Sequence, residues 1–102
     1  MKNFKDLTFE PHGFGEGLQA RMFFENGYGV SVVRFMIMGR YGSYTDNESE
    51  WELAVLRGNE DDATLTYDTD ITDDVLGHLS SEDVSDIMVQ VQSLPNAIPT
   101  NA

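Results

Sequence analysis

Few residues of this chain could do acid–base or nucleophilic chemistry. It has two histidines, His12 and His78, and no cysteine. The lack of cysteine excludes a thiolate nucleophile, a disulfide and a thiolate metal site. No serine or carboxylate stands at a spacing that would complete a catalytic triad with His78, which we expect on a short helix. We therefore predict that the protein is not an enzyme and uses no cofactor.

Oxygen ligands for a cation stand close together in the segment DTDITDD, at Asp68, Asp70, Asp73 and Asp74. The segment fails the calcium-loop template, because with Asp68 as position one the sixth residue is Asp73 instead of glycine, and the twelfth is Leu79 instead of glutamate. Helix capping and turn formation explain these acids more simply than a weak cation site. The GFGEG segment at Gly13 to Gly17 precedes a predicted strand, whereas a phosphate-binding loop precedes a helix. We predict no metal site.

The charge of the chain is its most unusual property. Eighteen acidic residues against six basic ones give a formal net charge of -12, and from Asp46 onward only Arg57 opposes fourteen acids. Such a chain would be repelled by phosphates, which argues against direct binding to nucleic acid or to an anionic membrane. It would instead be attracted to the basic surface of another protein. The N-terminus lacks the apolar run of a signal peptide, so we expect a cytoplasmic protein.

The acids and two nearby tyrosines form the predicted partner-binding surface. Asp46, Glu48, Glu50 and Glu52 alternate, so an extended segment would place a carboxylate on one side about every 6.6 Å. Such a row can imitate part of a nucleic-acid backbone, whose charges recur about every 3.4 Å along each strand. The alternative interpretation is a plain solvated face. The full predicted set is Asp46, Glu48, Glu50, Glu52, Glu60, Asp61, Asp62, Tyr41 and Tyr44.

A hairpin over residues 18–38 is the predicted centre of the fold. Asn26-Gly27 favours a two-residue type I′ turn, because both residue types tolerate positive φ. This turn would pair Met22 with Ser31, Ala20 with Val33 and Leu18 with Phe35 on the inner face. The outer face would then carry Arg21, Phe23, Val30, Val32, Arg34, Met36 and Leu56.

Three further strands are predicted at residues 6–10, 50–57 and 63–68. Alternation places Trp51, Leu53 and Val55 inward on the second of these, and Ala63, Leu65 and Tyr67 inward on the third. Each connection is short, and consecutive strands usually pair, so we expect an antiparallel meander.

The apolar period then changes from two to 3.6 residues. Thr72 would cap a short helix over residues 73–79, and Ser80, with Asp83 in the capping-box position, would cap a longer one ended by Pro95. The apolar stripe of this longer helix is Val84, Ile87, Met88, Val91 and Leu94. We predict an α+β fold: an antiparallel four- to five-stranded meander sheet with a C-terminal helix packed on one face. Residues 1–95 form one domain, and residues 96–102 a flexible tail.

The second sheet face has no predicted cover. It is too apolar to remain entirely in water. Either the N-terminal segment with Phe4, Phe9 and Phe14 folds over it, or it makes a dimer or partner contact.

The segments NGYGVSVVRF, WELAVL and LTYDTDITDDVLGHLSSEDV together resemble a set of small proteins encoded by tailed bacteriophages and prophages. The likeness covers Phe4 to Leu94. The set has no assigned activity, so the resemblance implies an origin but no catalytic residues. By analogy of size and charge it implies a DNA-mimicking inhibitor of a host nucleic-acid-handling defence protein, of the anti-CRISPR kind, acting in the host cytoplasm. The alternative is a homo-oligomeric accessory or structural phage protein, a homodimer formed through the outer sheet face.

Overall fold

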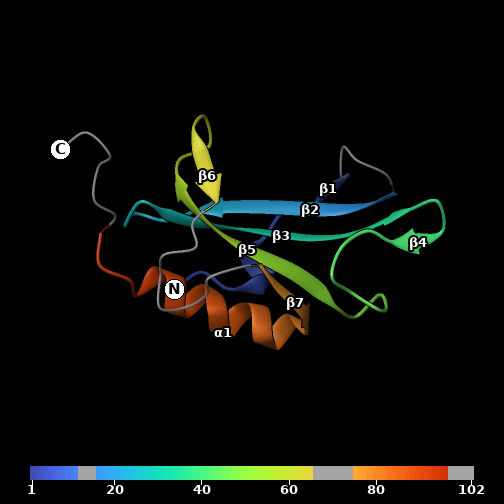
Figure 1. The fold of residues 1–102 in the computed structure, drawn as a ribbon. Helices are drawn as coiled ribbons and strands as arrows, with labels where there is room; N and C mark the ends of the chain where they lie inside the picture. Colours follow the sequence, from blue (N-terminus) through green and yellow to red (C-terminus); the bar gives the residue numbers. More distant parts are fainter. Residues whose placement is uncertain (12–15, 66–74, 97–102) are drawn as a thin grey trace.

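The computed structural model describes residues 1–11, 16–65 and 75–96. One antiparallel sheet of seven strands has the C-terminal helix on one face, which confirms the predicted α+β class (Figure 1). None of the helices in these ranges is long and apolar enough to cross a membrane. The elements in chain order are the 3₁₀ turn η1 (Phe4–Asp6), β1 (Glu10–Pro11), β2 (Glu16–Phe23), β3 (Tyr28–Ile37), β4 (Arg40–Tyr41), β5 (Trp51–Gly58), β6 (Ala63–Leu65), β7 (Leu76–Leu79) and α1 (Ser81–Gln92).

The main path through the sheet is the predicted meander, with two additions. The strand order is β1-β2-β3-β5-β6, while β4 pairs with the end of β3 and β7 pairs with the start of β5. The predicted helix over residues 73–79 is wrong for its described part, since Leu76–Leu79 is a strand whose ends lie opposite Leu53 and Trp51. Tertiary pairing with β5 overrides the local pattern there. Thr72 lies outside the described residues.

The turn between β2 and β3 has three residues, Glu25 to Gly27, and not two. The Phe24 N–H donates to the Tyr28 carbonyl at 2.8 Å, and only Gly27 of the turn has positive φ, at 84°. This is the three-residue hairpin in which the last loop position is left-handed. The true partners are therefore Met22 with Val30, Ala20 with Val32 and Leu18 with Arg34.

The predicted register was thus wrong by one residue, and a one-residue shift moves every side chain of a strand to the other face. Val30 and Val32, predicted to lie outward, are fully buried in the core against the helix. Ser31, Val33 and Phe35 take the opposite face.

Helix α1 buries its apolar stripe on the sheet, as predicted. The Ser80 hydroxyl accepts the Asp83 N–H and the Asp83 carboxylate accepts the Ser80 N–H, both at 3.0 Å, so the capping box is confirmed. The helix ends at Gln92, three residues before Pro95. The core joins the helix to inward residues of the sheet: Ala20, Val30, Val32, Trp51, Leu53, Val55, Val84, Ile87, Met88 and Val91.

The N-terminal segment packs on the helix side of the sheet. Residues 4–6 form η1, and of the strand predicted over 6–10 only Glu10 lies in a strand, β1. The ring centroids of Phe4 and Phe9 lie 5.5 and 4.6 Å from that of Trp51. These two phenylalanines therefore do not cover the other face. Phe14 lies outside the described residues.

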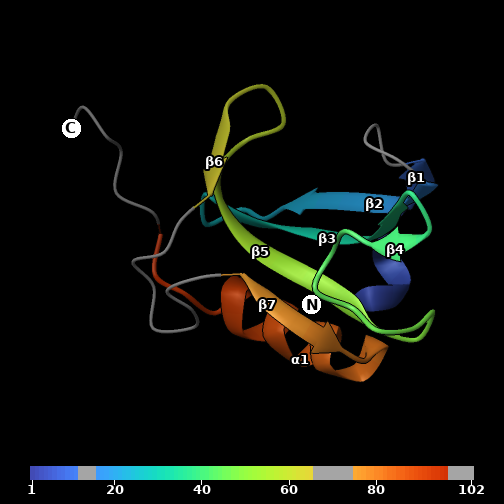
Figure 2. The ribbon, with the colours of Figure 1, turned by 45° about the vertical axis from the view of Figure 1, so that its right-hand side comes forward.

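The opposite sheet face carries no helix in the described ranges (Figure 2). Leu65, predicted to lie inward, is 48% exposed next to Leu56, its partner on β5. Tyr67 and residues 97–102 of the predicted tail lie outside the described residues.

Asn26 ties the hairpin turn to the end of the helix. Its Nδ2 donates to the Val91 carbonyl at 2.8 Å and to the Leu94 carbonyl at 3.1 Å, while its Oδ1 accepts the Tyr28 N–H at 3.1 Å. The last carbonyls of a helix have no full set of intrahelical donors, and the Asn26 side chain supplies additional N–H donors to them.

We expect Asn26→Ala to lower the free energy of unfolding by about 1–3 kcal/mol, because it removes the amide donor from the Leu94 carbonyl and one of the donors from the Val91 carbonyl. Asn26→Asp is the discriminating variant: it keeps the acceptor for the Tyr28 N–H, removes the amide donor and places negative charge at the negative end of the helix dipole. It should destabilise at least as much in urea unfolding. An Asn26→Asp protein as stable as wild type would show that the helix contact contributes nothing.

Candidate functional site

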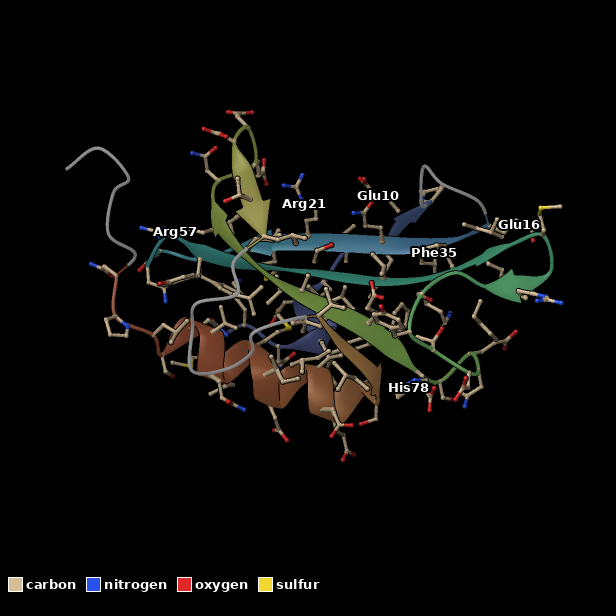
Figure 3. All side chains as sticks on the ribbon, viewed as in Figure 1. Glu10, Glu16, Arg21, Phe35, Arg57 and His78 are labelled. Atoms are coloured by element: carbon tan, nitrogen blue, oxygen red, sulfur yellow. The ribbon has the colours of Figure 1, made fainter. Side chains whose placement is uncertain are left out.

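Three titratable side chains converge at one end of the sheet. The Nδ1 of His78 lies 3.0 Å from Glu50 Oε1 and 3.4 Å from Asp46 Oδ2. Asp46 and Glu50 come from the loop between β4 and β5, and His78 comes from β7, twenty-eight residues beyond Glu50. Figure 3 labels His78 at this loop end of the molecule. We call these three residues the His78 cluster.

Backbone hydrogen bonds fold the loop into a turn that brings its two acids together. The Glu50 N–H donates to the Asn47 carbonyl at 3.3 Å, and the Asn47 side chain accepts the Ser49 N–H at 2.8 Å. The Asp46 N–H then donates to Glu50 Oε1 at 2.8 Å. Glu50 is thereby held in place by the backbone of the loop itself.

Tyr44 holds His78 against the loop. The His78 N–H donates to the Tyr44 carbonyl at 2.8 Å, and a Cβ on the preceding Gly77 would lie only 2.5 Å from the Tyr44 Cβ. His78 itself has a positive φ of 56°, a conformation uncommon for residues other than glycine. Close approach of the two backbones therefore fixes where the imidazole points.

The contacts shift the pKa values of both partners toward the charged forms. The pKa of Glu50 is lowered, first by the Asp46 N–H and then by the His78 hydrogen bond. The pKa of His78 is raised, chiefly by the hydrogen bond to Glu50; desolvation opposes this, and the charges of Asp46 and Glu50 add to the rise. The side chains of His78, Asp46 and Glu50 are 53%, 80% and 25% exposed, so the cluster is open to solvent.

The predicted row of alternating acids does not form. The chain bends at residues 47–49, so Asp46 and Glu50 meet at His78 instead of standing in line. Glu48 is exposed on the turn and its carbonyl accepts a hydrogen bond from Arg34. Glu52 Oε1 accepts the Tyr44 N–H at 3.1 Å. The segment thus lacks the regular spacing that would imitate a nucleic-acid backbone.

The second predicted acidic group lies elsewhere. Glu60, Asp61 and Asp62 form the turn between β5 and β6, where the Asn59 side chain accepts the N–H groups of Asp61 and Asp62. β5 has eight residues, so about 23 Å of strand separates this turn from the loop that precedes β5 (Figure 1). The predicted site residues therefore form two surfaces.

The two predicted interface tyrosines differ in exposure. Tyr44 is 58% exposed and stands on the loop of the His78 cluster. Tyr41 is half-buried on β4, opposite Met36. Only Tyr44 thus offers a largely free ring beside the acids.

A second source of acids joins the loop at this end. Helix α1 begins three residues after His78, and its first turn carries the exposed Glu82 and Asp83. We define the acidic end as the carboxylates of the loop, of the start of β5 and of this first turn: Asp46, Glu48, Glu50, Glu52, Glu82 and Asp83.

No lysine or arginine forms an ion pair with a carboxylate in residues 1–11, 16–65 and 75–96. Arg34 stacks over the Trp51 ring, with its guanidinium carbon 4.2 Å from the ring centre, and Arg21 lies over Phe23 at 5.1 Å. Both guanidinium groups thus contact aromatic rings. Arg34 also donates to the Glu48 carbonyl, so one cation lies beside the acidic loop, but it forms no ion pair with a carboxylate.

His78 is the residue that sequence reasoning undervalued. A helix over residues 73–79 offered it no carboxylate partner, whereas pairing of β7 with β5 places it beside two. The signal available was the short apolar LGHL segment, which is compatible with a strand. His12 and the four aspartates of DTDITDD lie outside the described residues.

Comparison of the chain with protein-family models, with curated proteins and with solved structures finds no match in any of the three.

An NMR titration in EDTA should give His78 a pKa above its ordinary value of 6.5, and Glu50→Gln should return it toward that value. Asp46→Asn should lower it less, because Asp46 acts only through its charge. The contribution of Glu50 to stability is fully present above pH 4.5 and is lost as the pH falls through the lowered pKa of Glu50. The contribution of His78 is fully present below pH 6.5 and is lost as the pH rises through the raised pKa of His78. Both contributions of the ion pair to stability are therefore present between pH 4.5 and pH 6.5. A His78 pKa at or below 6.5 in wild type would show that the contact does not form.

Proposed function

We propose that this protein is an interaction protein whose acidic end docks in the basic groove of a nucleic-acid-handling protein and competes there with nucleic acid. The observation that carries the proposal is the excess of negative charge: six carboxylates gather at one end of the sheet, and no described lysine or arginine forms an ion pair with them. Opposite charge steers association and makes it fast and salt-sensitive.

The loop is ordered before any partner arrives, which favours binding. Hydrogen bonds to Asn47, Glu50 and Glu52 hold the backbone of residues 44–50, so little entropy is lost when the loop docks. The exposed ring of Tyr44 adds a rigid aromatic surface beside the acids.

The resemblance to small phage proteins supports a particular partner class. A phage protein of this size and charge would act in the cytoplasm of a bacterial host, and a nuclease of restriction or CRISPR defence presents the basic groove that the acidic end requires. Because the loop is bent, its carboxylates do not follow the regular spacing of phosphates. The protein would therefore inhibit by occupying the basic groove, without copying the geometry of a nucleic-acid backbone. The lack of enzymatic activity stays a prediction.

Affinity capture from a bacterial lysate, in EDTA and across a salt series, tests the proposal. Wild type should retain nucleic-acid-binding proteins at low salt and release them when a DNA duplex is added. Asp46→Lys, Glu48→Lys and Glu50→Lys together should abolish this capture, because they reverse the charge of the loop.

Glu60→Lys, Asp61→Lys and Asp62→Lys together provide the matched control. They change the net charge by the same amount, at the other end of β5, and should leave most of the capture intact. Equal loss with both variants would show that net charge alone is responsible, and the acidic end would have no special role. Capture that DNA does not displace would also contradict the proposal.

Self-association through the open sheet face is the second candidate. Leu65 is 48% exposed beside Leu56, and no helix covers this face in the described ranges. Sedimentation velocity should then show a dimer whose fraction rises with concentration and is lost in Leu65→Lys, since a buried unpaired charge is costly. A monomer at high concentration would remove this candidate.

A further inference from the structure

We propose that the His78 cluster binds a divalent transition-metal ion, with Zn²⁺ as the best match. His78 Nδ1 and one carboxylate oxygen each of Asp46 and Glu50 all lie within 4.8 Å of one another. Zn²⁺ bound tetrahedrally at about 2.0–2.1 Å holds its ligand atoms about 3.4 Å apart. The separations of 3.0 and 3.4 Å from Nδ1 are close to this value, and the two carboxylate oxygens lie within 4.8 Å of each other.

The donor set selects the kind of ion. One imidazole nitrogen with two carboxylate oxygens suits Zn²⁺ and related transition metals, whereas Ca²⁺ and Mg²⁺ prefer oxygen donors throughout. Three protein ligands leave a fourth position for water, and the open surroundings of Asp46 and His78 give an ion access.

The ligands are held from outside the cluster. Tyr44 fixes the backbone of His78, and the buried hydroxyls of Ser43 and Thr45, 2.9 Å apart, anchor the loop that carries Asp46 and Glu50. A site whose ligands are already in place loses little entropy on binding. The remaining carboxylates of the acidic end raise the local concentration of cations.

Binding of the metal ion to His78 displaces one proton. His78 must offer the Nδ1 lone pair, so the proton shared between Nδ1 and Glu50 leaves for solvent when the ion binds. This site goes beyond the proposed function and requires no partner protein, so its test with purified chain is separate from the capture experiment in EDTA.

Calorimetric titration of the purified full chain with ZnCl₂ near neutral pH should show one ion per chain. His78→Asn, which keeps a side chain that tolerates the left-handed backbone, should weaken binding by at least about tenfold. Glu50→Gln should weaken it similarly. Glu60→Gln, at the other end of β5, is the matched control for the carboxylate and should change affinity by less than about twofold. An ¹⁵N spectrum should show the Nδ1 resonance of His78 move on addition of Zn²⁺.

Several results would overturn the site. Absence of Zn²⁺ binding would do so, and so would binding that His78→Asn and Glu50→Gln leave unchanged. Ca²⁺ or Mg²⁺ bound as tightly as Zn²⁺, without dependence on His78, would indicate diffuse attraction to the acids. Should His78→Asn fail to fold, the Nδ1 resonance of wild type and the Asp46→Asn variant decide the question, since both report on the same ligand atoms.

Discussion

The length of the turn at Glu25 to Gly27 is the constraint on which the rest of the structure depends. Three residues, with Gly27 left-handed, set the register in which Met22 lies opposite Val30 and Ala20 opposite Val32. Those side chains then face α1, and the stripe of the helix has a continuous apolar surface to bury. Because side chains alternate along a strand, one residue more or less in the turn would present Ser31 and Val33 to the helix instead. Asn26 reinforces the arrangement by joining the same turn to the helix end.

The same sheet determines where the candidate site forms. β5 runs from the acidic loop to the Glu60–Asp62 turn, and two strands share one of its edges: β6 at its end and β7 at its start. The position of β7 brings His78 to Asp46 and Glu50, and the connection from β7 into α1 adds Glu82 and Asp83 to the same end. One strand pairing thus produces both the histidine–carboxylate cluster and the gathering of charge around it.

The described arginines explain why that charge remains available to a partner. Arg21 lies over Phe23, and Arg34 lies over Trp51 and donates to the Glu48 carbonyl, so neither guanidinium group is paired with a carboxylate. Among the described side chains, His78 alone forms ion pairs with these acids. A histidine is a partner whose charge changes near physiological pH, so the local field of the acidic end responds to protonation and to cations more than an arginine pair would.

Local patterns in the sequence determined the α+β class, the helix that starts at the Ser80 capping box, the inward residues of β5 and the excess of negative charge. Each of these depends on neighbours in the chain: apolar spacing, a cap three residues from its partner, a count of acids. Tertiary structure alone decided the face of β3, the identity of β7 and the meeting of His78 with its two carboxylates. Those features depend on loop length and on pairing between segments far apart, and the LGHL segment becomes a strand only because the free edge of β5 supplies its hydrogen-bond partners. The acids could be counted from the sequence, but where they gather could not, because the bend at residues 47–49 and the length of β5 separate them into two surfaces.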